Sequence, residues 1–249
     1  TEVINPRDLK QPGLIELEDA RLPVAALRVS AFFEPWSFEA VTIHEHPGSK
    51  ISGKGSDFDY YTLLRAFGLS ISDKQSPDFG IEDTSLALKV NHAYNGGDIS
   101  FIAANTFDDQ PYLSYNGLTS GVMVFTPKYD RVKTYGISSS FVKGSSLFKV
   151  EAAFKHDKKI MRNDFLSQIS SGLASSLVRT TSRENQISAL TGIEYTGLAD
   201  LRLSFEAQTV HTLNHQSSLV MDENEYITYF QVTKDMLHET LKLDLFWVY

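Results

Sequence analysis

The sequence predicts an all-β protein: an antiparallel up-and-down transmembrane β-barrel with about ten visible strands, expected to be part of a larger barrel. Three observations predict it. Segments of about ten residues alternate apolar and polar side chains, very short turns join them in pairs, and long polar loops join the pairs. Short turns on one rim and long loops on the other are typical of outer-membrane barrels. Residues 1–249 are expected to form one domain, led by a loop at 1–22.

The five expected hairpins follow one another along the chain, each with a short turn that contains Gly, Pro or Asp. The paired segments are 24–33 with 36–45, 85–94 with 98–107, 131–142 with 147–156, 187–196 with 201–212, and 225–233 with 241–249. The alternation is clearest at 201–212, where Leu203 and Phe205 share one face. Arg202 and Glu206 share the other face, as period two requires.

The connections between hairpins are long and rich in Gly, Ser, Asp and Lys. They are expected at 47–82, 108–130, 157–184 and 214–224. Loops longer than about 12–15 residues are uncommon in compact soluble domains, so their recurrence favours the barrel. Within the first of them, Asp57 is expected to cap the N-terminus of a helical turn at 58–67.

Composition narrows the class of protein. The 249 residues include 23 basic and 31 acidic side chains, a formal net charge of −8, which argues against nucleic acid as a partner. The absence of Cys excludes disulfides, thiolate zinc sites and Cys nucleophiles. No apolar run of about 18 residues predicts a transmembrane helix. No cofactor is expected.

Alternation alone leaves two interpretations of the faces. In a soluble β-sheet protein that binds lipid or glycan on one face, the apolar side chains would form a core. In a membrane barrel they would face lipid, and the charged side chains would line a polar lumen. Strand length and aromatic residues near the strand ends favour the barrel. These aromatic residues are Trp36, Phe38, Tyr94, Phe107, Tyr135, Tyr195, Trp247 and Tyr249.

The best candidate for a functional site is the set of charged residues on the polar face of the strands. These residues are expected to line the lumen along the substrate path. The set comprises Arg28, Lys89, Lys149, Glu151, Glu194, Arg202, Glu206, Lys242 and Asp244. A charged wall of this kind could select solutes. The alternative is a ladder of cross-strand ion pairs that fills the interior and fixes the strand register.

Other candidate sites are weaker. His44 and His46 could share a metal at a strand end, but no third ligand is evident. Two acidic clusters could hold calcium but lack the spacing of a dedicated calcium loop. They are Asp222 with Glu223 and Glu225, and Asp108 with Asp109. No common catalytic motif is present, and the Ser-rich stretch at 170–177 has the composition of a loop, so the protein is not expected to be an enzyme.

Several stretches resemble the Gram-negative outer-membrane family known as the domain of unknown function numbered thirteen hundred and two. They are VINPRDLKQPGLIELEDARLPV at 3–24, GSDFD at 55–59, GGDISFIAANTFDDQPY at 96–112, LTGIEYTGLADLRLSFEAQ at 190–208 and KDMLHETLKLDL at 234–245. Members of that family are usually longer, so the chain resembles an interior or truncated portion of a larger barrel. The final Tyr249 resembles the C-terminal aromatic residue that barrel-assembly machinery recognises.

The resemblance implies transport and not catalysis. It implies an outer-membrane protein of a Gram-negative bacterium that exports or moves a small, hydrophobic or lipidic molecule. The implied partners are outer-membrane lipids, an outer-membrane lipoprotein and a resistance-nodulation-division permease.

Overall fold

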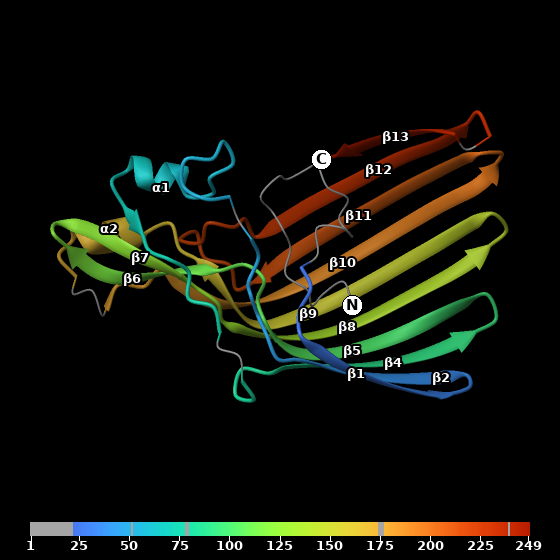
Figure 1. The fold of residues 1–249 in the computed structure, drawn as a ribbon, viewed down its shortest axis with the longest axis horizontal. Coiled ribbons are helices and arrows are strands. Elements are labelled where there is room, and N and C mark those ends of the chain that lie inside the picture. Colours follow the sequence, from blue (N-terminus) through green and yellow to red (C-terminus); the bar gives the residue numbers. More distant parts are fainter. Residues whose placement is uncertain (1–21, 51, 78–79, 174–176, 239) are drawn as a thin grey trace.

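A computed structural model describes residues 22–50, 52–77, 80–173, 177–238 and 240–249. Ten of its strands form one antiparallel sheet in the order β1-β2-β4-β5-β8-β9-β10-β11-β12-β13. The sheet is a long curved wall, and tight turns lie at one end of it (Figure 1). The other end carries a separate assembly of helices and short strands. This confirms an all-β antiparallel sheet of ten strands; the sheet is not closed.

The sheet strands run antiparallel to each neighbour, mostly in unbroken register. Their bounds are β1 Ala26–Phe33, β2 Trp36–Ile43, β4 Ser85–Tyr94, β5 Gly97–Phe107, β8 Arg131–Lys143, β9 Ser146–Met161, β10 Thr181–Leu198, β11 Leu201–Leu213, β12 Asn224–Met236 and β13 Leu241–Val248. All five expected hairpins are present. In the turns other than β1–β2, residues such as Gly96 and Asp200 adopt the positive φ that a tight reversal needs.

Two strands are longer than the alternation predicted. β9 extends well beyond the expected end at 156, and β10 begins well before the expected start at 187. The alternation did not reveal these extensions, because a bulge near Asp157 interrupts the two-residue period. At that point the pairing jumps between Glu184 and Gln186, so the polar and apolar faces exchange parity on β9. The expected loop at 157–184 is therefore wrong at both of its ends, where its residues are strand.

The long connections build a compact unit, here called the loop assembly. It contains α1 Thr62–Ala66, β3 Ser70–Ile71, β6 Tyr112–Thr119, β7 Val122–Lys128 and α2 Phe165–Ser170. β3, β7 and β6 form a second, three-stranded sheet. Phe125 is fully buried there and packs against Phe165 with Tyr61, Leu69 and Leu113.

Two further expectations about the loops are wrong. Residues 108–130 are not a plain loop, because β6 and β7 pair as a hairpin within them. Asp57 does not cap a helix: α1 starts at Thr62, and its N-cap position, Tyr61, makes no side-chain capping hydrogen bond. Asp59 takes part instead, accepting a hydrogen bond from the Tyr61 backbone at 3.0 Å and pairing with Arg65. Among the described residues, no helix is both long enough and apolar enough to cross a membrane.

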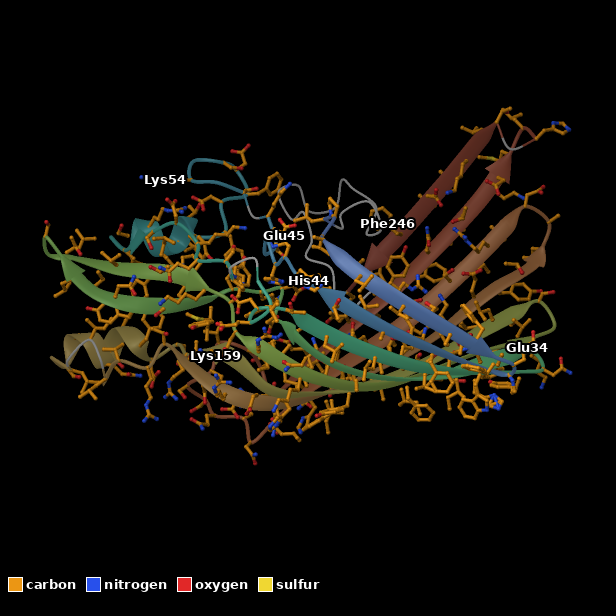
Figure 2. The ribbon with its side chains drawn as sticks, turned by 60° about the horizontal axis from the view of Figure 1, so that its bottom comes forward. Glu34, His44, Glu45, Lys54, Lys159 and Phe246 are labelled. Carbon is orange, nitrogen blue, oxygen red and sulfur yellow. The ribbon has the colours of Figure 1, made fainter. Side chains whose placement is uncertain are left out.

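The curvature of the sheet makes an open trough whose edges are β1 and β13 (Figure 2). Glu34 marks the tight-turn end of the β1–β2 hairpin, and His44 and Glu45 follow β2 at the end near the loop assembly. Phe246, on β13, projects into the trough. Its register partner is Gln231, so the face that carries Gln231 is the concave one. The expected leading loop at 1–22 lies outside the described residues except for Leu22.

Candidate functional site

The register places all nine predicted charged residues on the concave face. Directly opposed residues of antiparallel strands point to the same side, so the pairings can be followed from strand to strand. Across one row of the sheet, Asp98 opposes Ser140, Ser140 opposes Lys149, Lys149 opposes Gly192, and Gly192 opposes Glu206. The same pairings place the other seven residues on this face: Arg28, Lys89, Glu151, Glu194, Arg202, Lys242 and Asp244. That they line a lumen stays a prediction.

The other face is apolar and more exposed. Phe101 is 49% exposed and Ile137 41%, although both lie in the middle of the sheet. On the concave face the neighbouring Ser100 is 1% exposed and Thr134 4%. This distribution is the reverse of that in a water-soluble sheet, where apolar residues point into the core. It is the distribution expected of a wall whose convex side meets lipid.

Three groups of charged residues lie along the concave face. At the β1 edge, Arg28 forms an ion pair with Glu39, and Glu39 lies directly opposite Lys89 on β4. These three charges alternate in sign across neighbouring strands. Opposite charges placed in this way are expected to favour the observed register of β1, β2 and β4.

The second group is an ion pair that crosses an intervening strand. Lys149 Nζ on β9 lies 3.6 Å from Glu206 Oε1 on β11, and Gly192 of β10 lies between them. Glycine leaves room for this approach, because a Cβ atom at position 192 would lie 3.0 Å from Glu206 Cγ. The sequence predicted the parity of both charges. It did not predict that a glycine brings them together.

The third group lies near the tight turns at the β13 edge. Thr233 Oγ1 donates a 2.6 Å hydrogen bond to Asp244, and Lys242 Nζ lies 3.1 Å from the same carboxylate. Arg202 Nη2 donates to Thr233 Oγ1 at 3.5 Å. Two cations therefore flank one carboxylate here. Glu151 and Glu194 lie on the same face.

The concave face also carries hydroxyl and amide groups that were not singled out from the sequence. Their side chains are uncharged, so only the alternation along each strand indicated which face they lie on. Ser100 Oγ donates to Asn91 Oδ1 at 2.6 Å, and Ser140 donates to Asp98. Closer to the loop assembly, Gln186 Nε2 donates to Thr212 Oγ1 at 3.1 Å, and both side chains are buried. The concave face is therefore polar through neutral as well as charged groups.

A buried ion pair joins the sheet to the start of the β5–β6 connection. Lys158 Nζ lies 3.3 Å from Asp108 Oδ2, and both side chains are about one-tenth exposed. Burial acts to raise the pKa of Asp108, but Lys158 and hydrogen bonds from Asp109 and the Gln110 backbone bring it below its usual value. Burial and the adjacent Asp108 raise the pKa of Asp109. The folded protein thus stabilises the charged form of Asp108 and disfavours the charged form of Asp109.

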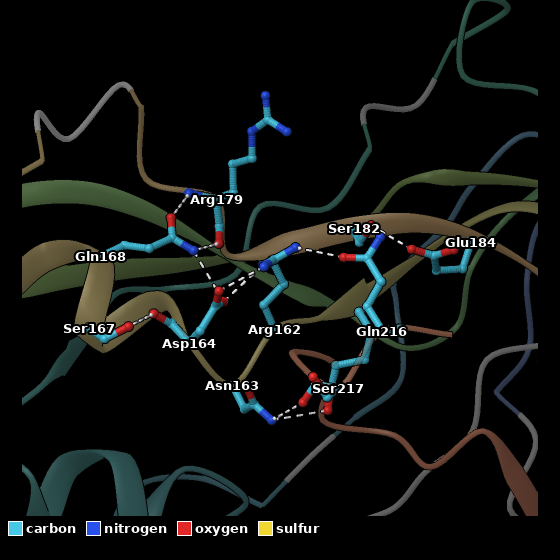
Figure 3. Close-up of polar contacts among 11 residues, drawn as sticks. Arg162, Asn163, Asp164, Ser167, Gln168, Arg179, Ser182, Glu184, Gln216 and Ser217 are labelled. Atoms are coloured by element: carbon cyan, nitrogen blue, oxygen red, sulfur yellow. Dashed lines mark hydrogen bonds and ion pairs between the residues drawn. The ribbon is translucent and has the colours of Figure 1, made fainter. Parts of the chain in front are cut away.

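The loops between β9, β10 and β12 are held by a polar network (Figure 3). Arg162 donates to both carboxylate oxygens of Asp164, at 2.8 and 2.7 Å. Asn163 Nδ2 donates to the backbone of Ser217 and Leu219. Gln168, on α2, accepts from the Arg179 backbone N–H at 2.9 Å. These contacts connect α2 to the segment before β10, and the segment before α2 to the β11–β12 loop.

The weaker candidates are not brought together as ligands. Both ring nitrogens of His44 lie within hydrogen-bond distance of threonine hydroxyls, those of Thr42 and Thr84. His46 is buried between Phe107 and Tyr129, and burial lowers its pKa. Within the described ranges, no group of three His, Asp or Glu side chains could hold a metal ion. Part of the Ser-rich stretch, 174–176, lies outside the described residues; Ser170 ends α2.

Comparisons with known proteins agree with this architecture. The outer membrane channel DcaP of Acinetobacter baumannii matches with a TM-score of 0.51 and 8% identity, over 90% of this chain and 55% of that one. The chain thus spans about half the length of that channel. A porin structure matches with a TM-score of 0.47 and 8% identity, over 99% of this chain and 72% of that one.

No curated protein matches the sequence. A family model described as "Protein of unknown function (DUF1302)" matches residues 1–239. This match spans nearly the whole chain and includes every one of the stretches on which the expected resemblance depended, except the last six residues of the 234–245 segment. The chain belongs to the DUF1302 family.

Proposed function

We propose that the chain forms part of the wall of an outer-membrane β-barrel channel, through which a small molecule passes along the concave face. The observation that carries this proposal is the inverted distribution of side chains across the sheet, with apolar residues exposed on the convex side and polar residues on the concave side. The fold shared with an outer membrane channel supports it. Further strands between β13 and β1 would complete the barrel.

The concave face favours a small hydrophilic solute. Both signs of charge occur on it, and hydroxyl and amide groups lie between them. A wall of this kind keeps water in the lumen and offers hydrogen bonds to a solute without holding it tightly. A polar lumen needs no cofactor or reacting group, so passage rather than catalysis is the proposed activity.

A hydrophobic cargo is the second candidate, and one observation favours it. Near the β13 edge the concave parity carries Phe246, 64% exposed, and Val248 beside Tyr229. This apolar strip could guide an acyl or aromatic molecule along the wall. In that case an outer-membrane lipoprotein and a resistance-nodulation-division permease are the proposed partners.

Ion selectivity in planar lipid bilayers tests the channel proposal. The full-length protein is expected to form conducting pores, and Arg202→Glu is expected to shift the cation-to-anion permeability ratio towards cations by about twofold or more. The shift follows because two elementary charges change on the concave face, beside Asp244.

Lys234→Glu is the matched control. Lys234 follows Thr233, the register partner of Arg202, and therefore lies at the same height on the opposite face. The same charge reversal there should leave selectivity unchanged. Absence of conductance, or equal shifts in both variants, would contradict passage along the concave face.

A further inference from the structure

A group of basic side chains lies on the convex face, just beyond the apolar band and next to the loop assembly. We call Arg131, Lys133, Lys159 and Arg183 the convex basic cluster. Arg131 and Lys133 share the parity of the exposed Tyr135 on β8. Beyond the bulge, Lys159 and Arg183 oppose each other on the convex side of β9 and β10. Four cations therefore lie close to the same end of β8, β9 and β10, on the face that carries the apolar band.

Carboxylates near the cluster are fewer than its cations. Asp130 is shared, at 3.2 Å from Lys159 and 2.7 Å from Arg183. Arg131 lies 4.0 Å from Asp83 and stacks over Phe107, with 4.4 Å between the guanidinium carbon and the ring centroid. Next to them, His156 and Asp157 pair with each other at 3.3 Å.

Two members of the cluster remain accessible to an external anion. Lys133 is exposed, and the described residues show no ion pair or hydrogen bond of its ammonium group. The Arg183 side chain is 51% exposed, although it contacts Asp130. An exposed cation on a lipid-facing surface is best accommodated where the chain reaches the headgroup layer, because anionic headgroups attract it there.

The two ends of the convex face differ. Near the tight turns it carries exposed aromatic residues, among them Tyr94, Phe141 and Tyr195. Two lysines lie there, the exposed Lys143 and Lys234, and Lys234 donates to the backbone carbonyl of Ala199 at 2.9 Å. More cations thus lie at the end with the long loops, which in outer-membrane barrels is the external end.

We propose that the convex basic cluster binds the phosphate of an anionic phosphorylated lipid, whose acyl chains lie against the apolar band. Tyr135, Phe154 and Ile187 form the row of that band nearest to the cluster, so one lipid could contact both at once. This inference rests on the proposed function, because it requires the convex face to meet the outer leaflet. It adds the class of lipid and the residues that recognise it.

Lipid binding to the full-length protein in detergent micelles tests the proposal, with native mass spectrometry as the readout. Diphosphoryl lipid A is the probe, and the same lipid without its phosphates and inorganic phosphate are the comparison ligands. The wild type is expected to retain diphosphoryl lipid A in preference to both. Binding of inorganic phosphate with equal affinity would mean that the cluster recognises a free anion, and would overturn the lipid assignment.

The double variant Lys133→Ser/Arg183→Gln should weaken lipid A binding by about 30-fold, at about 1 kcal/mol for each basic side chain near a membrane surface. Lys159 remains to pair with Asp130 in this variant. The control Lys234→Ser removes one positive charge from the same face at the opposite end and should have no effect. Equal loss in both variants, or equal binding of the dephosphorylated lipid, would overturn the proposal.

Heat-modifiable migration in gels separates this inference from the proposed function. If the wild type does not behave as a detergent-stable barrel, the proposed function fails, and the lipid site fails with it. If the barrel is intact but shows no preference for phosphorylated lipid, the lipid site alone is wrong.

Discussion

The ten-stranded sheet and the loop assembly place their apolar residues according to opposite rules. In the loop assembly, Phe125 is 0% exposed and packs among other aromatic and aliphatic side chains. In the sheet, large apolar residues such as Val150 and Phe101 are about half exposed, and the buried residues include Ser100 and Thr212. One polypeptide therefore contains a water-soluble core next to a surface suited to lipid.

The difference shows which solvent each region is built for. Burying a Phe side chain away from water contributes about 1.5–3 kcal/mol to folding stability. The loop assembly gains this contribution from its own buried core. The sheet gains nothing comparable in water, because its apolar face has no protein partner among the described residues. Its stability depends on backbone pairing and on a hydrocarbon environment.

The largest effect is expected from Phe125→Ala in the loop assembly. Removing a fully buried Phe leaves a cavity, and the expected cost is about 3–5 kcal/mol. The measurement is hydrogen exchange of the β6–β7 amides, whose protection should fall by this free energy. Phe101→Ala is the matched control, because it removes the same side chain from the convex face of the sheet. Equal loss of β6–β7 protection in both variants would show that the two regions are not separate units.

A smaller effect is expected when charge is added to the convex face. Ile137→Arg places a cation at the centre of β8 on the lipid side, at an expected cost of about 2–4 kcal/mol. Ser138→Arg places it on the concave side and should cost little, because the side chain meets water. The measurement is the free energy of unfolding from lipid vesicles. A larger cost for Ser138→Arg than for Ile137→Arg would contradict the assignment of the convex face to lipid.

The smallest effect concerns the pair of carboxylates between the two regions. Because the pKa of Asp109 is raised in the folded protein, its stabilising contribution is present below about 3.8 and is lost as pH rises through the raised pKa. Asp109→Asn should therefore increase Tm at neutral pH, by about 2–4 °C for each kcal/mol recovered. The gain should vanish at pH values where Asp109 is protonated in both states. A gain that is unchanged at low pH would exclude titration as its cause.

Much of the sheet could be predicted from the sequence because period two is a local signal. The strand at Ser85–Tyr94 was predicted with its observed bounds, and the parity of Arg202 and Lys149 followed from their neighbours. The extension of β9 could not be predicted, because the bulge at Asp157 shifts the alternation by one residue. The β6–β7 hairpin was not predicted from the sequence, because Gly117 lies within β6 and Gly121 lies beside β7, and glycines are more typical of loops than of strands.

The sequence by itself determined the hairpins, their order and the two faces of each strand, because these depend on residues one or two positions apart. Only the tertiary structure decided which charges meet. Lys149 reaches Glu206 because Gly192 is placed between them, and Lys158 reaches Asp108 because the chain returns over the end of the sheet. Such contacts join residues about 50 positions apart, and their distances depend on the curvature and register of the whole sheet, which no local pattern contains.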